Sequence, residues 1–382
     1  MMINKIEPRL LKIVNSLNVD NELECVLYAN DFERLKNHLN QAFVNVCPIR
    51  FINAFVVKLN HKNIFQLAGL NIVKYITQST KVSALVNVAN KILRTENVID
   101  SKPDDFSVAV IDTGIYPHLD FEIPRNKIIK FVDLVNGKEE PYDDNGHGTF
   151  VSGVIAGSGT VDPKYKGINP NANLVVIKAL DAKGETGAST ILNAMQWVYD
   201  NKEEYNIRVV CMSFGSVPLG KNDPLKLGAE RLWDSGIVVV SAAGNSGPSS
   251  ETIKSPGSSY KVITVGALDD HRIGGQPQYP LFSVADFSSR GPINGIYKPD
   301  MIASGVNING LNNRHNPFYT KMSGTSVSTP MVVGVVCIVL RQYPSFTPDQ
   351  VKKYLINSST AITGDRNSEG FGYLDGRKLN IT

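Results

Sequence analysis

Short runs of apolar, mostly β-branched residues beyond about residue 100 constrain the fold of this chain most strongly. They occupy positions 108–111 (VAVI), 174–177 (LVVI), 209–212 (VVCM), 237–240 (IVVV) and 262–265 (VITV). A run that is apolar at every position predicts a strand buried on both faces, as in a parallel sheet. Segments of helical character, such as 188–199, separate several of these runs. The pattern predicts an α/β domain with a parallel sheet, helices on both faces and right-handed crossovers.

The first 80 residues have a different character. They are rich in Asn, Lys and Leu and contain a single glycine, Gly69. Their apolar patterns predict strands and helices in alternation, with strands at 24–29, 54–59 and 72–77 and helices at 32–39 and 62–68. This alternation is typical of a small α+β (ferredoxin-like) domain of the split βαβ type. We therefore expect domains at 1–80 and 106–382, joined by a polar connector at 81–105.

Charge and composition argue against several classes of partner. The net charge is +3, from 39 basic and 36 acidic residues among 382, which predicts neither a nucleic-acid nor a membrane partner. The N-terminus carries charges and Pro8 and shows no signal peptide. The longest apolar run, 331–340, is too short to span a bilayer and is expected to be a buried helix. The four cysteines form no CxxC pair and are expected to be buried thiols, which favours a cytoplasmic location.

A carboxylate ends the first apolar run. Asp112 follows residues 108–111, and Gly114 then turns the chain away. Open α/β sheets bind ligands beyond the carboxyl ends of their strands, which makes Asp112 a candidate site residue. On its own, an aspartate at this position is equally typical of a cap or a turn.

A histidine stands between two glycines. His147 lies in Gly146-His147-Gly148 and precedes an apolar helical run at 150–156. Glycines on both sides allow close approach by another backbone or by a substrate. A structural histidine is the alternative interpretation, although packing gives no reason for two flanking glycines.

A serine lies at or near the start of the apolar helix expected at 331–340. Ser326 stands in the segment SGTSVSTP, residues 323–330. The free N–H groups and the dipole of a helix N-terminus favour negative charge, which suits a serine whose attack on a carbonyl produces an oxyanion. Serine is also a common helix cap, so Ser326 alone does not decide the matter.

Taken together, these three residues supply the parts of nucleophilic serine catalysis. A serine nucleophile needs a base to accept its proton, and the base needs a carboxylate that fixes its tautomer and stabilises its cation. Ser326, His147 and Asp112 provide one group of each kind.

Four segments carry a resemblance to the subtilase family of serine proteases: AVIDTG, NGHGTFVSG, SAAGNSGP and MSGTSVSTP. The resemblance covers about 106–372 and is strongest to the minor intracellular subtilisin type, on 142–147 (YDDNGH), 255–257 (SPG) and 287–292 (FSSRGP). It implies a subtilisin-like peptidase domain with the triad of Asp, His and Ser in the family's order. It also implies that Asn245 and the backbone N–H of Ser326 form the oxyanion hole, where a neutral amide donor of fixed geometry is well suited.

The same resemblance implies how a polypeptide substrate binds, namely as an extra strand between two extended segments. These segments would be formed by Gly184, Glu185 and Thr186 and by Ser213, Phe214 and Gly215. The S1 pocket would be lined by Ala242, Ala243 and Gly244 and by the backbone near Phe214. Lys254 aligns with the far end of S1, where many relatives have a small residue. Our hypothesis is that Lys254 favours acidic or polar P1 side chains; alternatively its ammonium extends to solvent.

No cofactor is expected. Residues 158–162 lack the Asn-rich stretch that forms the strong calcium site of secreted subtilisins, so that site is not expected here. Weak calcium or sodium sites built from carbonyl oxygens leave little trace in a sequence and stay open. Phe150 and Val327-Ser328 also depart from the usual family residues, but neither change removes a catalytic group.

A small α+β unit in front of a subtilase domain resembles an inhibitory prodomain that also assists folding of a sheet rich in non-local contacts. The expected protein is a serine endopeptidase that acts through an acyl-enzyme, is made as a zymogen, and cleaves itself between about Ser79 and Val88. Its expected partners are polypeptide substrates and its own prodomain. Alternatives are a permanent N-terminal domain and a catalytically silent regulator or scaffold. A nucleotide-binding protein is disfavoured, because no glycine-rich phosphate motif follows a strand.

Overall fold

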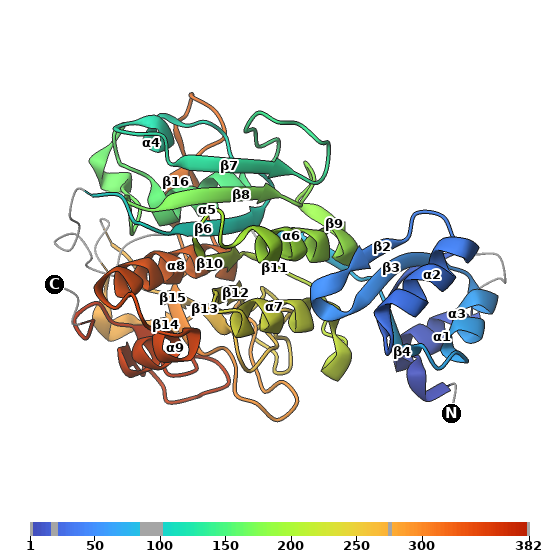
Figure 1. Ribbon diagram of the computed structural model, residues 1–382. Coiled ribbons are helices and arrows are strands. Elements are labelled where there is room, and N and C mark those ends of the chain that lie inside the picture. The colour runs from blue at the N-terminus through green and yellow to red at the C-terminus, as the bar shows by residue number, and fades with distance from the viewer. Residues whose placement is uncertain (1–2, 17–21, 85–101, 274–276, 380–382) are drawn as a thin grey trace.

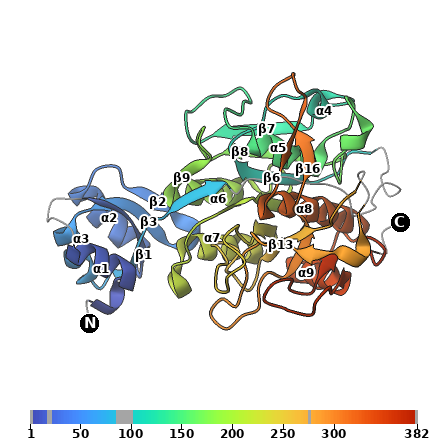
Figure 2. The same cartoon turned by 180° about the vertical axis from the view of Figure 1, so that it is seen from behind.

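Two sheets of different kinds organise the molecule. The computed structural model describes residues 3–16, 22–84, 102–273 and 277–379. A ten-stranded sheet forms the centre of the larger part, and a four-stranded sheet forms a separate module from residues near the N-terminus. Figures 1 and 2 show this N-terminal module at one side of the large domain, next to helices α6 and α7.

The large sheet is mostly parallel. Its strand order is β18-β19-β15-β13-β12-β10-β6-β8-β7, and β14 pairs with β13. The strands are β6 (Ser107–Asp112), β7 (Ile128–Asp133), β8 (Asn173–Lys178), β10 (Ile207–Met212), β12 (Val238–Ala242), β13 (Ile263–Asp269), β14 (Ser283–Val284), β15 (Met301–Ser304), β18 (Ser359–Thr360) and β19 (Tyr373–Leu374). Only the short strands β14 and β18 pair antiparallel with their neighbours in this sheet. Each of the five apolar runs falls in one of its strands, with only the first residues of two runs, Ile237 and Val262, lying just before β12 and β13. This confirms the predicted fold class.

Helices cover both faces of this sheet. They are α4 (Leu119–Glu122), α5 (His147–Ala156), α6 (Ala188–Asn201), α7 (Pro224–Asp234), α8 (Thr325–Gln342) and α9 (Pro348–Asn357). Helices α5 and α8 pack against each other, as do α6 and α7, and both α5 and α6 contact β6. A hairpin of β16 (Ile308–Leu311) and β17 (Tyr319–Met322) packs on α5.

Helix α8 begins six residues before the apolar run that predicted it. Pro330 lies inside it, close to the N-terminal end, where the missing N–H costs few helical hydrogen bonds. Among the described residues, α8 is the one helix long and apolar enough to cross a membrane, and 89% of that stretch is buried inside the protein. It therefore serves as a core helix, as the sequence predicted.

The N-terminal module has the order β2-β3-β1-β4, with every pair antiparallel. Its elements are α1 (Pro8–Ser16), β1 (Leu23–Ala29), α2 (Phe32–Ala42), β2 (Cys47–Ile49), β3 (Ala54–Leu59), α3 (His61–Ala68) and β4 (Val73–Gln78). The side chains of Asp31 and Asn60 accept hydrogen bonds from the first turns of α2 and α3, which fixes where these helices begin. The three strands and two helices expected from the sequence are present, and α1 and β2 are additional.

Alternation along β1 gives this module two apolar faces. Cys25 and Leu27 belong to the module's own core, with residues of α1, α2 and α3. Val26 and Tyr28 belong instead to the core of the large domain, with residues of α6 and α7. Because side chains alternate across a strand, one short sheet closes one core and docks on another.

The four cysteines are free. Cys25, Cys211 and Cys337 are buried, as expected, and burial raises the pKa of each thiol. For Cys47 the expectation of a buried thiol is wrong. It is half-buried because β2 is an edge strand, and its Sγ lies 3.2 Å from Oδ1 of Asn193 on α6.

Candidate active site

The site residues gather where the strand order of the large sheet reverses. Strand β6 has β8 on one side and β10 on the other, so the chain leaves the centre of the sheet in both directions. Such a switch point opens a crevice at the carboxyl ends of the strands. Asp112 is the last residue of β6, and Ser213 directly follows β10.

Asp112 and His147 form a buried pair. Both residues are 0% exposed, and His147 Nδ1 lies 2.7 Å from Asp112 Oδ1. The same carboxylate oxygen accepts a hydrogen bond from Thr113 N at 2.7 Å. A carboxylate at Nδ1 favours the tautomer that carries its proton there, which leaves Nε2 as the basic nitrogen.

The glycines around His147 have the role that the sequence suggested. A Cβ added to Gly148 would lie 2.1 Å from the carbonyl oxygen of Gly114, so only glycine allows this approach of two backbones. Gly146 has a φ of +105°, in the region that favours glycine, and directly precedes α5. The first residue of α5 is His147 itself, so these contacts set the height of the imidazole above the sheet.

Asp143 holds the start of α5 and was not singled out from the sequence. Its Oδ1 accepts hydrogen bonds from Gly146 N at 2.8 Å and from Thr113 Oγ1 at 2.9 Å, and its Oδ2 accepts from Thr149 N at 2.8 Å. The carboxylate thus joins the helix that carries His147 to the strand end that carries Asp112. The sequence signal that could have identified Asp143 is an acidic residue shortly before a helix, where the helix dipole favours negative charge.

Ser326 lies in the first turn of α8. The residue before it, Thr325, donates a hydrogen bond to Asn245, so the N-terminus of this helix lies next to Asn245. The Ser326 Oγ is buried and makes no hydrogen bond within the described part of the chain. Its N–H belongs to the first helical turn, where no intrahelical acceptor is present. A side-chain oxygen without a hydrogen-bond partner among the described residues and a first-turn backbone donor therefore belong to the same residue.

Thr325 fixes the orientation of the Asn245 amide. Asn245 Oδ1 accepts from Thr325 N at 3.0 Å and from Thr325 Oγ1 at 2.9 Å, and Thr325 Oγ1 accepts in turn from Gly244 N at 3.1 Å. With Oδ1 occupied, Nδ2 is the end of the amide that can donate to a developing negative charge. Nothing in the sequence distinguishes Thr325 from the other residues of the serine motif.

A strand of the chain itself lies between the two segments predicted to bind substrate. Strand β5 (Lys81–Ala84) pairs antiparallel with β9 (Glu185–Gly187) on one side and with β11 (Phe214–Gly215) on the other. Ser83 lies opposite Glu185 and Gly215. Residues 81–84 were expected to belong to a connector; they form a strand because both edges offer unpaired backbone groups. Gly184 and Ser213 directly precede β9 and β11.

The predicted S1 residues lie together at the carboxyl end of β12, with Ala242 as its last residue. Ala242 and Ala243 are buried, and Gly244 has a φ of +112°. Lys254 N donates to the carbonyl oxygen of Ala243 at 2.8 Å, and a Cβ added to Gly244 would lie 2.5 Å from Lys254 Cγ. The half-buried Lys254 thus packs its aliphatic stem against Gly244.

Residues 158–162, where no strong calcium site is expected, are held by hydrogen bonds to other protein groups. Asp120 Oδ1 accepts from Val161 N at 3.0 Å, and Tyr319 Oη donates to Asp120 Oδ2 at 3.4 Å. Across residues 3–16, 22–84, 102–273 and 277–379, no group of three or more His, Cys, Asp or Glu residues is arranged to hold a metal ion.

Asp112 and His147 form a buried pair at the carboxyl end of β6 in a mostly parallel α/β sheet, an arrangement typical of serine peptidases of the α/β type. The model of the subtilase family matches residues 104–373, well over half of the chain. The chain therefore belongs to the subtilase family, and it is a subtilisin-like serine endopeptidase.

Particular relatives support the same assignment. The chain is 38% identical over 360 residues to serine protease AprX of Bacillus subtilis (strain 168), covering 87% of this chain and 78% of that one. It is 32% identical over 277 residues to subtilisin DY of Bacillus licheniformis, covering 72% and 90%. Among solved structures it resembles fervidolysin from Fervidobacterium pennivorans, with a TM-score of 0.72 and 22% identity. That match covers 95% of this chain and 61% of fervidolysin, and it supports the fold alone.

Proposed function

We propose that this endopeptidase hydrolyses polypeptides with the triad Asp112, His147 and Ser326 and is made as a zymogen. In this proposal the N-terminal module, with β5, inhibits the site until the chain cleaves itself. The observation that carries the proposal is the position of β5 between β9 and β11, beside a buried Asp–His pair. A substrate strand would pair with the same two edges.

The proposed chemistry uses one group from each of the three side chains. Ser326 Oγ attacks the scissile carbonyl while His147 Nε2 accepts the hydroxyl proton, and Asp112 stabilises the imidazolium at Nδ1. Asn245 Nδ2 and the Ser326 N–H donate to the oxyanion. His147 then protonates the leaving amine, which leaves an acyl-enzyme, and water attacks this ester by the same steps in reverse.

The direction of β5 supports a position for the proposed self-cleavage. β5 runs antiparallel to β11, which directly follows β10, so the chain beyond Ala84 heads toward the carboxyl end of β10 and hence toward Asp112. We therefore propose that cleavage occurs after Ala84, in the second half of the window between Ser79 and Val88. Residues 85–88 lie outside the described residues.

Labelling and self-processing test the proposal together. The full chain, its Ser326→Ala variant and a matched Ser328→Ala control are treated with a fluorophosphonate, and their masses are followed with time. Ser328 is buried in the same helix, and its Oγ donates to Ser304 O at 3.2 Å. The wild type and S328A should be labelled and should lose the residues up to at least Ala84. S326A should be neither labelled nor shortened. Wild-type protein that is neither labelled nor cleaved would support a silent regulator or scaffold. Cleavage that persists in S326A would contradict self-processing.

We further propose that Lys254 makes S1 favourable to acidic or polar P1 side chains. Its stem packs on Gly244, in the predicted wall of that pocket, and the described residues offer its ammonium no carboxylate partner within 4.0 Å. An ammonium without a partner can pair with a substrate carboxylate at little desolvation cost. A P1-scanning peptide library should show that Lys254→Ala reduces cleavage after Glu and Asp relative to Leu. An identical profile for both proteins would leave solvent as the destination of the ammonium.

A further inference from the structure

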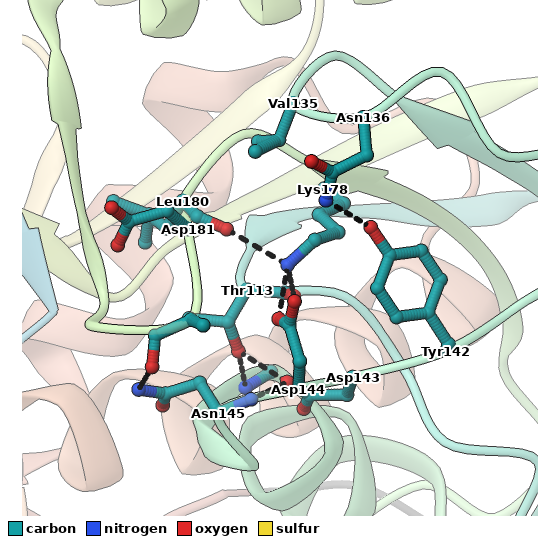
Figure 3. A network of polar contacts seen from close by, with 12 residues as sticks. Thr113, Val135, Asn136, Tyr142, Asp143, Asp144, Asn145, Lys178, Leu180 and Asp181 are labelled. Carbon is teal, nitrogen blue, oxygen red and sulfur yellow. Dashed lines mark hydrogen bonds and ion pairs between the residues drawn. The ribbon is translucent and has the colours of Figure 1, made fainter.

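Lys178 is a fully buried lysine next to the triad, and the steps above do not use it. Its side chain is 0% exposed, and its ammonium makes three contacts (Figure 3). Lys178 Nζ donates to Thr113 O at 2.6 Å, to Asp144 Oδ1 at 2.7 Å and to Leu180 O at 3.1 Å. An ammonium has three N–H donors, and all three have acceptors here. Since burying a charge without partners costs several kcal/mol, this complete set of acceptors accounts for its survival in the interior.

The three acceptors come from three segments that serve different parts of the reaction. Thr113 directly follows Asp112, and Asp144 stands three residues before His147. Leu180 begins the segment that leads into β9, one edge of the substrate cleft. The backbone strengthens this junction, because Leu180 N donates to Asp112 O at 3.1 Å.

An aromatic ring and its polar partners close the other side of this ammonium. The centroid of the Tyr142 ring lies 5.1 Å from Lys178 Nζ. Tyr142 Oη donates to Asp133 Oδ2 at 2.8 Å and accepts from Asn136 Nδ2 at 2.6 Å, so the ring is held in place (Figure 3). Burial raises the pKa of Tyr142 to about 12, so the ring presents a neutral face to the cation.

A second buried lysine on the same sheet provides a comparison. Lys298 is 1% exposed, and its ammonium contacts Asp300, Thr264 Oγ1 and Val262 O. Its partners belong to β13 or lie next to β13 and β15, and none adjoins a triad residue. A buried lysine can therefore serve the sheet alone, which makes Lys298 a matched control for Lys178.

We propose that Lys178 is a positioning residue for peptide hydrolysis. Its ammonium holds the Asp112 strand end, the loop before His147 and the segment leading to β9 in one geometry. Contacts that a long substrate makes at the cleft edge are then transmitted to the reacting groups as a gain in turnover. This inference rests on the proposed function.

Replacement by methionine removes the ammonium and keeps most of the stem. Wild type, Lys178→Met and Lys298→Met would be produced as full chains and assayed after self-processing. Their active sites would be counted by fluorophosphonate labelling. For each protein, kcat and KM are measured on a tetrapeptide anilide and on a single-residue anilide. Remote substrate contacts normally raise kcat on the longer substrate. In K178M this advantage should fall by about 10–100-fold, mainly in kcat, because small misplacements of reacting groups cost that much.

The control and a second variant make each outcome decisive. K298M should lose thermal stability and keep the wild-type advantage. Should K178M fail to fold, Asp144→Asn takes its place: its side chain is 36% exposed, and a loss of about 3–10-fold in the same ratio is expected from the loss of one charged acceptor. If K178M cleaves itself slowly, its rate of self-cleavage is compared with that of K298M, because the chain around Ala84 is itself a long substrate. An advantage within twofold of wild type in K178M, or in D144N as its substitute, overturns the proposal. Absent labelling of the wild type would count against the proposed function itself.

Discussion

The N-terminal module, with the strand β5 that follows it, meets the large domain at β9 and β11. The two parts contribute different kinds of group to the candidate site. The large domain contributes particular side-chain atoms, such as Asp112 Oδ1 against His147 Nδ1 at 2.7 Å. The module contributes the backbone of β5, which pairs with β9 and β11. A site built on side-chain atoms depends on the identity of each residue. A strand held by N–H and C=O groups accepts many residues and is sensitive to the loss of a donor.

The largest effect should come from a side chain of the large domain. Asn245→Ala removes the proposed oxyanion donor, and kcat should fall by about 10²–10³-fold with little change in KM, the range found for the equivalent donor in subtilisin itself. The measurement is steady-state hydrolysis of a peptide anilide, normalised to labelled active sites. A fall of less than threefold would show that the oxyanion is held by other groups, and the contrast between side-chain and backbone groups would lose its main support.

The contribution of the module should respond to the backbone instead. Ser83 pairs with both β9 and β11. Proline at this position removes its N–H and leaves the acceptor in the ladder unpaired, at a cost of about 3 kcal/mol or about 100-fold, the upper end for a lost hydrogen-bond partner. In full-length Ser326→Ala protein, where β5 competes with added peptide, Ser83→Pro should tighten binding of a fluorescent tetrapeptide by about that factor. Ser83→Ala keeps the N–H and should change it by less than about twofold. Equal effects of the two variants would mean that the Ser83 side chain, not the backbone, holds β5.

Docking of the module on the large domain should have a smaller effect on the same assay. Phe51 is 8% exposed, and a Cβ added to Gly228 of α7 would lie 3.3 Å from its ring, so it is packed between the two parts. Phe51→Ala should weaken docking by about 2 kcal/mol, below the range of about 3–5 kcal/mol for aromatic truncations in a core, because the ring lies at an interface. Peptide binding to the S326A protein should then tighten by about 30-fold. Val44→Ala, at a site 86% exposed in the same module, should leave it unchanged. A shift shared by both variants would point to general loosening of the module.

The smallest effect concerns a group that serves the fold of the large domain alone. Burial lowers the pKa of Lys298 to about 7, with the nearby Lys352 acting in the same direction. Between pH 7 and the ordinary lysine pKa, the unfolded chain binds a proton that the folded chain lacks, so stability rises with pH over this window. From pH 7 to 8, the melting temperature of wild type relative to Lys298→Met should rise by about 3 °C, equivalent to roughly 1 kcal/mol. A difference that stays constant with pH would show that Lys298 remains protonated in the folded protein.

The sequence predicted most of the fold because its apolar runs report burial directly. The residues Asp112, His147, Ser326 and Asn245 stood out because each lies in a short segment with glycines or small residues around it. Asp143 and Lys178 did not, since a carboxylate in a loop and a lysine at a strand end are ordinary in isolation. Their roles depend on which segments the folded chain brings within 3 Å. Strand β5 was missed for the same reason: it is a strand only because two distant edges receive it.

The hydrogen bonds of Thr325 have a mechanical consequence. Its N–H and its Oγ1 both bind Asn245, and it is the residue immediately before Ser326. A displacement of the start of α8 is therefore expected to move the proposed nucleophile Ser326 and the proposed oxyanion donor Asn245 together. Thermal motion of that helix should therefore change the distance between Ser326 and Asn245 little.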